Sequence, residues 1–122
     1  MRKHMSLNEL LQQLKTDPQS VEFQQVIDLI NSLYDYTPTP FSNGLGEGTV
    51  ANAAGTNEGS CRIFAFAKLN GLDQAQTLAC FGRFYRVDVL QNPAGGDHAN
   101  IRNFMRHGWE GIRFEGEALK LK

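Results

Sequence analysis

Cys61 is the strongest candidate nucleophile in this sequence of 122 residues. It stands at the start of a predicted apolar helix, where the positive end of the helix dipole and the neighbouring Arg62 would lower the thiol pKa. A cysteine nucleophile also needs a base and a group that orients the base, which His98 and either Asp97 or Asn100 would provide. These residues predict a cysteine-dependent hydrolase or transferase if the thiol and the imidazole meet in the fold. The alternative is that the cysteine is a small core residue.

Two polar stretches predict a binding cleft instead of a reaction centre. The first is the Asn52–Ser60 loop, and the second is the helix start over Asp97–Asn103. Backbone N–H groups that lead into a helix can hold an anion, although Glu58 in the loop would repel one. The residues that we assign to ligand binding are Asn52, Asn57, Glu58, Ser60, Arg86, Asn103 and Trp109. This second hypothesis, a small binding or interaction module, requires a concave polar surface and no activated nucleophile.

The glycine-rich loop lacks the motifs that bind nucleotides. Gly44, Gly46 and Gly48 do not form G-x-G-x-x-G, and no Gly-Lys-Ser/Thr follows them. His98 and His107 do not have the i, i+3 or i+4 spacing of metal ligands on a helix. We therefore expect neither a cofactor nor a metal ion. Whether the chain is an enzyme stays open between the two hypotheses.

The composition is typical of one folded, soluble domain. Of the residues, 41% are hydrophobic and 20% are charged, which excludes a disordered chain. Twelve basic and thirteen acidic side chains give a net charge of −1, so we expect no nucleic-acid or membrane partner. No apolar run approaches the ~18 residues of a membrane span. Cys61 and Cys80 stand among apolar residues, which predicts the reduced, buried thiols of an intracellular protein.

Hydrophobic periodicity places helices around the polar stretches. Apolar residues recur at helical spacing over Leu7–Leu14, and Ser6 with Glu9 forms a capping box before them. Asp17-Pro18 ends that helix. The further elements predicted are a helix with its apolar face over 23–34, short strands near 36–41 and 48–51, a central helix over 61–69, a helix from 73 to about 92, a helix from 97 to 108 and a strand over 109–114.

Together these elements predict an α+β fold. We expect a single compact domain that is mostly helical, with four to five helices and a small sheet of two to three short strands. Residues 1–5 come before any pattern, so we expect an added or flexible N-terminal segment there and a single domain over 6–122. Gly82 is unfavourable inside the helix that begins at Asp73, which predicts a close approach of another helix at that point.

Short strings along the sequence resemble the HopJ type III effector protein family. They are Asn57–Cys61 before the apolar helix, Cys80–Gly82, Tyr85-Arg86, Asp97–Phe104 and Gly108-Trp109. With Thr37-Pro38 and Asn43-Gly44 included, the resemblance extends over nearly the whole chain, from Leu7 to Leu119. No single string is a catalytic signature, and the family supplies no catalytic residues. The resemblance therefore implies a HopJ-like domain without implying a reaction.

The resemblance also implies a bacterial protein with a small intracellular domain. The family is named after proteins that type III secretion injects into plant cells. Such effectors usually begin with a flexible, serine-rich segment, whereas helical periodicity here begins by Leu7. We therefore expect a resident protein of the bacterial cytoplasm, and the alternative is secretion into a host cell. The expected partner is a protein or a small molecule, or a host protein if the chain is exported.

Overall fold

A computed structural model describes residues 5–122, and residues 1–4 lie outside the described part. The N-terminal segment expected over residues 1–5, which includes His4, therefore falls mostly outside it. Met5 is described, and its sulfur accepts a hydrogen bond from Gln25 Nε2 at 3.0 Å. This contact ties the start of the described chain to the second helix.

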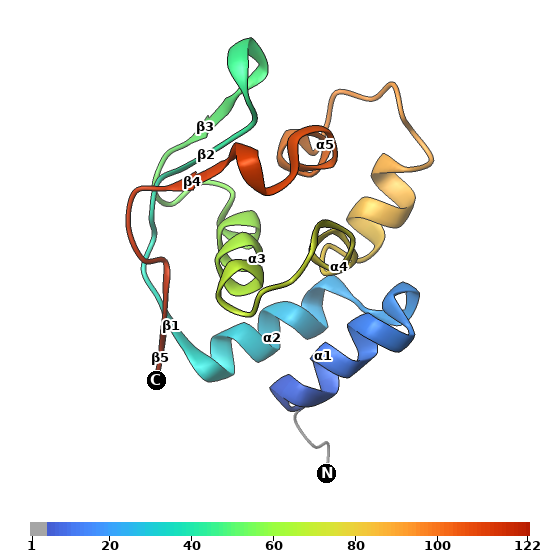
Figure 1. The fold of residues 1–122 in the computed structure, drawn as a ribbon, viewed down its shortest axis with the longest axis vertical. Helices are drawn as coiled ribbons and strands as arrows, with labels where there is room; N and C mark the ends of the chain where they lie inside the picture. The colour runs from blue at the N-terminus through green and yellow to red at the C-terminus, as the bar shows by residue number, and fades with distance from the viewer. Residues whose placement is uncertain (1–4) are drawn as a thin grey trace.

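Helices make up most of the described chain and surround one central helix, α3 (Figure 1). The α-helices are α1 (Leu7–Thr16), α2 (Phe23–Leu33), α3 (Glu58–Leu69), α4 (Gln74–Ala79) and α5 (Ala99–His107). A π-helical turn spans Phe84–Val89, and 3₁₀ turns span Pro18–Ser20, Gly46–Gly48 and Gly108–Gly111. The strands are β1 (Tyr34–Tyr36), β2 (Phe41–Asn43), β3 (Val50–Asn52), β4 (Ile112–Phe114) and β5 (Leu119–Leu121). The predicted α+β fold with mostly helical content is confirmed.

The strands of the described residues form two small antiparallel sheets where the sequence predicts a single sheet. In one sheet β1 pairs with β5, and in the other β2 lies between β3 and β4. The chain between β1 and β2 contains Pro38 and Pro40. Proline lacks the N–H group that a continuous strand would donate. Strand pairing therefore stops after β1 and resumes at β2 in a different sheet.

The helix α3 lies at the centre of the hydrophobic core because it is apolar on nearly all sides. Its Phe64 and Phe66 are fully buried. Phe64 packs against Phe104 of α5 and Phe41 of β2, with ring-centroid distances of 5.0 Å and 5.9 Å. Burying one such side chain contributes about 1.5–3 kcal/mol, so this cluster joins α5 and the three-stranded sheet firmly to α3.

The helix expected from Asp73 to about residue 92 is divided at Gly82. α4 ends at Ala79, Gly82 has a φ of +59°, and the chain continues as the π-helical turn. A Cβ at Gly82 would lie 2.6 Å from the backbone nitrogen of Phe23, at the start of α2. The close approach expected at Gly82 is therefore present. It accompanies a break in the helix, because a residue with positive φ does not continue a right-handed helix.

Candidate functional site

Asn57 and His98 begin the two helices that meet at a shared cleft. They are the non-glycine residues of the described chain with positive φ, at 48° and 51°. Asn57 is the N-cap of α3 and His98 is the N-cap of α5, and neither side chain caps its own helix. A left-handed conformation outside glycine costs about 1–3 kcal/mol, so other contacts must hold both residues in place.

The cleft between these helix starts has a volume of about 340 Å³. Its polar lining consists of Asn57, Ser60, His98 and Asn100. Its apolar lining consists of Phe23, Val50, Phe81, Phe84 and Ile101, with Gly59 and Ala99 between the two groups. A concave site of this size, with aromatic rings and a few polar groups, is typical of small-molecule pockets.

A network of asparagine amides adjoins the cleft, because its members Asn57 and Asn100 also line the cleft. Asn100 Nδ2 donates to Asn52 Oδ1 at 2.9 Å, and Asn52 Nδ2 donates back to Asn100 Oδ1 at 3.1 Å. Asn57 Nδ2 donates to the same Asn52 oxygen at 2.8 Å, and Asn43 Nδ2 donates to Asn100 Oδ1 at 3.0 Å. Asn103 Nδ2 donates to the Asn43 carbonyl oxygen at 3.0 Å. The amides thereby fasten β2 and β3 to α5 and to the start of α3.

These hydrogen bonds contribute to the stability of the fold because the amides are buried. Asn43, Asn52, Asn100 and Asn103 are each at most 7% exposed. A buried amide group that loses its partner costs about 1–3 kcal/mol. Within residues 5–122, Asn43 Oδ1 is the buried side-chain oxygen that has no hydrogen-bond partner.

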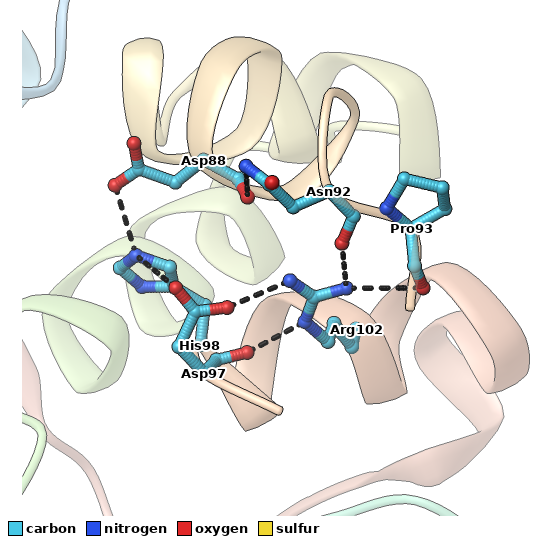
Figure 2. A network of polar contacts seen from close by, with 6 residues as sticks. All are labelled: Asp88, Asn92, Pro93, Asp97, His98 and Arg102. Atoms are coloured by element: carbon cyan, nitrogen blue, oxygen red, sulfur yellow. Dashed lines mark hydrogen bonds and ion pairs between the residues drawn. The ribbon is translucent and has the colours of Figure 1, made fainter. Parts of the chain in front are cut away.

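Arg102 of α5 forms hydrogen bonds with the loop that comes before His98 (Figure 2). Its Nε donates to the Asp97 carbonyl oxygen at 2.6 Å, and its Nη2 donates to Asp97 Oδ1 at 2.7 Å. Its Nη1 donates to the carbonyl oxygens of Asn92 at 2.9 Å and Pro93 at 3.3 Å. The bond from Arg102 holds the pKa of the Asp97 carboxyl below its usual value. The Arg102 guanidinium therefore bonds to both ends of the 92–97 loop and fixes the backbone just before His98.

The His98 ring is held at the edge of the cleft by contacts from the π-helical turn. Its Nε2 lies 3.1 Å from Asp88 Oδ2 (Figure 2). The ring also packs against Phe84, at a centroid distance of 5.5 Å. Asp97 Oδ2 lies farther from the same nitrogen, at 3.9 Å. The carboxylate nearest to the imidazole is thus Asp88, which the sequence analysis did not select as its partner.

Cys61 is not among the residues that line the cleft. The residue is only 1% exposed, and its Sγ donates to the Thr39 carbonyl oxygen at 3.6 Å. Burial raises the pKa of this thiol, and it outweighs the opposing hydrogen bond with Tyr36 and the charge of Arg62. The expected lowering of the thiol pKa is therefore wrong. The thiol and the His98 imidazole bond to different partners, and the cysteine-dependent reaction stays a prediction.

The other residues assigned to ligand binding have structural partners. Glu58 Oε1 accepts a hydrogen bond from Tyr36 Oη at 3.1 Å. Arg86 Nη2 donates at 2.6 Å to a carbonyl oxygen in the turn before α2. Trp109 Nε1 donates to the Leu72 carbonyl oxygen at 3.0 Å. These three side chains do not line the cleft, and neither do Asn52 and Asn103, which belong to the amide network.

The apolar wall of the cleft was not predicted as part of a site. Phe23 and Phe81 follow helical periodicity, which indicates core positions, and Phe84 stands between Arg83 and Tyr85. Phe23 and Phe84 meet edge to face at a centroid distance of 5.0 Å. They meet because the chain turns at Gly82, and the sequence carries no signal for the direction of that turn.

The chemical groups that the cleft presents are suited to binding. They are an imidazole held by a carboxylate, amide and hydroxyl groups, and phenylalanine rings. Among residues 5–122, no group of three or more His, Cys, Asp or Glu side chains is placed to hold a metal ion. None of the described helices is long and apolar enough to cross a membrane. The fold and the cleft define a small α+β protein with a ligand-sized hollow where two helices begin.

Comparison with known proteins identifies the family. The family model of the HopJ type III effector protein matches residues 7–119, and the chain belongs to this family. The chain is also similar to the protein in the crystal structure of unknown function protein VPA0580, with 51% sequence identity and a TM-score of 0.92. That match covers 98% of this chain and 97% of the other. None of the curated proteins matches the chain significantly.

Removal of the Asn100 side chain tests the amide network. Asn100→Ala removes the buried hydrogen bonds between the Asn100 amide and the side chains of Asn43 and Asn52, although both residues keep other partners. We therefore expect it to lower the free energy of unfolding by about 1–3 kcal/mol. Urea unfolding followed by circular dichroism measures this loss. Asn92→Ala is the matched control, because the Asn92 amide makes an exposed bond, and it should cost less than about 0.5 kcal/mol. Equal losses for the two variants would contradict the assigned role.

Alkylation of the thiols tests the cysteine-dependent hypothesis. Burial raises the pKa of both thiols, that of Cys80 to about 12, so little thiolate is present at neutral pH. We expect both cysteines to resist iodoacetamide in the folded protein and to react after unfolding in urea, as measured by mass spectrometry. Rapid alkylation of Cys61 in the folded protein, abolished by His98→Ala, would instead support a catalytic thiol.

Proposed function

We propose that this HopJ family protein is a binding module that holds a small ligand in the cleft between α3 and α5. The observation that carries the proposal is the cleft itself, a hollow of about 340 Å³ lined by phenylalanine rings and by amide, hydroxyl and imidazole groups. The ligand that fits this lining has a flat apolar body and a carboxylate or similar acceptor group. A binding role needs no activated nucleophile, which agrees with the buried thiol of Cys61.

The apolar body is supported by the phenylalanine wall. Phe23, Phe81 and Phe84 line the hollow, and Phe23 and Phe84 already contact each other edge to face. Aromatic rings favour offset or edge-to-face partners, and each such contact contributes about 0.5–1.5 kcal/mol beyond the buried area. A planar ring in the ligand would find this geometry already formed.

The acceptor group is supported by the donors at the two helix starts. Ser60 supplies a hydroxyl in the first turn of α3, and both α3 and α5 begin without a capping side chain. First-turn N–H groups without an internal partner favour negative or acceptor groups. Glu58, which the sequence analysis expected to repel an anion, bonds to Tyr36 and does not line the cleft.

A titration with benzoate tests the proposal, with backbone amides observed by ¹H–¹⁵N correlation spectra. We expect saturable shifts at millimolar benzoate, centred on Gly59, Ser60, Ala99 and Ile101. Benzylamine has the same ring and the opposite charge, and it should shift these amides far less. Ala99→Leu fills the cleft and should abolish the benzoate shifts, whereas Ala51→Leu on the exposed face of β3 should not. Equal responses to both compounds, or shifts spread over the chain, contradict the proposal.

We also propose that the protein acts inside the bacterial cell. Its two cysteines are free and buried, which is typical of a reducing compartment. The family name refers to type III effectors, so export into a host cell and a host-protein partner form the alternative. The epitope-tagged chain can be expressed in a bacterium with an active type III system. Fractionation of that culture into cells and medium distinguishes residence from export. Retention with the cells supports residence, and recovery from the medium in a secretion-dependent manner contradicts it.

A further inference from the structure

A second hollow, larger than the cleft, lies beside β5 and has a volume of about 810 Å³. It shares no lining residue with the cleft between α3 and α5. Its apolar lining comes from α1, α3, β4 and β5 and includes Leu7, Ala65, Leu69, Phe114, Leu119 and Leu121. We refer to it below as the β5 groove.

Two large apolar side chains of the β5 groove are exposed to solvent. Leu69 at the end of α3 is 60% exposed, and Leu121 in β5 is 70% exposed. Single exposed leucines are common, but these two line the same hollow. Exposed apolar residues gathered in a concave surface are typical of an interaction site.

The wall of this groove is a strand with one open edge. Within the described chain, β5 pairs with β1 alone. The Ala118 carbonyl oxygen accepts from Thr37 N–H at 2.8 Å, and Lys122 N–H donates to the Leu33 carbonyl oxygen at 3.0 Å. Because alternate residues of a strand bond to opposite sides, the N–H and C=O groups of Leu119 and Leu121 point away from β1. Leu121 is 70% exposed whereas Leu119 is 4% exposed, so an additional strand would pair with β5 at Leu121.

The charges beside the open edge are mainly positive. Lys68 of α3 and Lys120 of β5 line the groove, against a single acidic residue in its lining, Glu117. Lys120 lies between Leu119 and Leu121, so its side chain projects to the opposite face of the strand from theirs. A strand laid against β5 would therefore meet apolar and basic side chains in alternation.

We propose that the β5 groove docks an extended segment of another protein, which adds to β5 as a strand and alternates apolar with acidic side chains. The open edge supplies main-chain hydrogen bonds, as in other cases of strand addition. The apolar side chains of the segment cover Leu69 and Leu121, and its carboxylates, which project to the other face of the added strand, approach Lys120. The proposal is independent of the small ligand assigned to the cleft, since the two sites share no residue.

Binding of a fluorescein-labelled hexapeptide, in which valine and glutamate alternate, tests the proposal by fluorescence polarisation. We expect saturable binding that weakens as salt is added, because salt screens the lysines. Lys120→Glu should raise the dissociation constant about tenfold, since it replaces an attraction by a repulsion. Lys15→Glu makes the same charge change on the exposed side of α1, outside the groove, and should leave binding nearly unchanged. Thermal unfolding of both variants checks that neither loses its fold.

Two altered peptides separate the parts of the proposal. A peptide with lysine in place of glutamate should bind at least tenfold more weakly, and equal binding would overturn the role of the charges. A peptide with methylated backbone nitrogens cannot pair with a strand edge, and equal binding of that peptide would overturn strand addition. Absence of binding at millimolar peptide overturns the whole proposal. So does a dimer in sedimentation equilibrium that Leu121→Asp dissociates, because the occupant would then be a second copy.

Discussion

The paired amides of Asn52 and Asn100 are the contact on which the arrangement of the cleft depends. Each amide donates to the other, which joins the end of β3 to the first turn of α5. Asn57 bonds to the same Asn52 oxygen, so the start of α3 is fixed by the same pair. In a medium of low dielectric constant these amide hydrogen bonds are strong, and a buried amide group that loses its partner is costly. The network therefore favours one relative position of the two helix starts, and the cleft between them is preformed.

The aromatic core supplies the rigid support that the amides need. Phe64 of the central helix contacts Phe104 on α5 and Phe41 on β2, the elements that also carry network asparagines. The position of the sheet against α5 is therefore fixed twice, by directional hydrogen bonds and by close packing. Packing alone tolerates small shifts between similar side chains, whereas buried amides tolerate little. The network thereby holds Asn57 in its left-handed conformation, whereas Asp88, Phe84 and Arg102 hold His98 in its own.

Burial and the helix start act on the pKa of the Cys61 thiol in opposite directions, and their magnitudes decide which of the two prevails. A helix start stabilises a nearby anion by about 0.3–1 kcal/mol, which is less than one unit of pKa. Full burial disfavours the charged form by as much as about 3–5 units. With the thiol 1% exposed, burial prevails, and the side chain behaves as a small core group. The polar chemistry of the molecule lies instead at His98, which remains at the edge of the cleft.

The sequence by itself determined most of the helical segments, because capping and periodicity are local properties, but it did not show that the helix from Asp73 is divided at Gly82. The capping box at Ser6 and Glu9 forms as the pattern predicts, and the stretch after Cys61 is the buried central helix. The sequence also drew attention to Asn57 and His98, since polar residues gathered at helix starts are visible in one dimension. Only the tertiary structure decided that Asp88 holds His98, because that contact depends on the turn at Gly82 and on the packing of α2 against it. The direction of such a turn is set by contacts between residues far apart in the chain, and the local sequence does not predict these contacts.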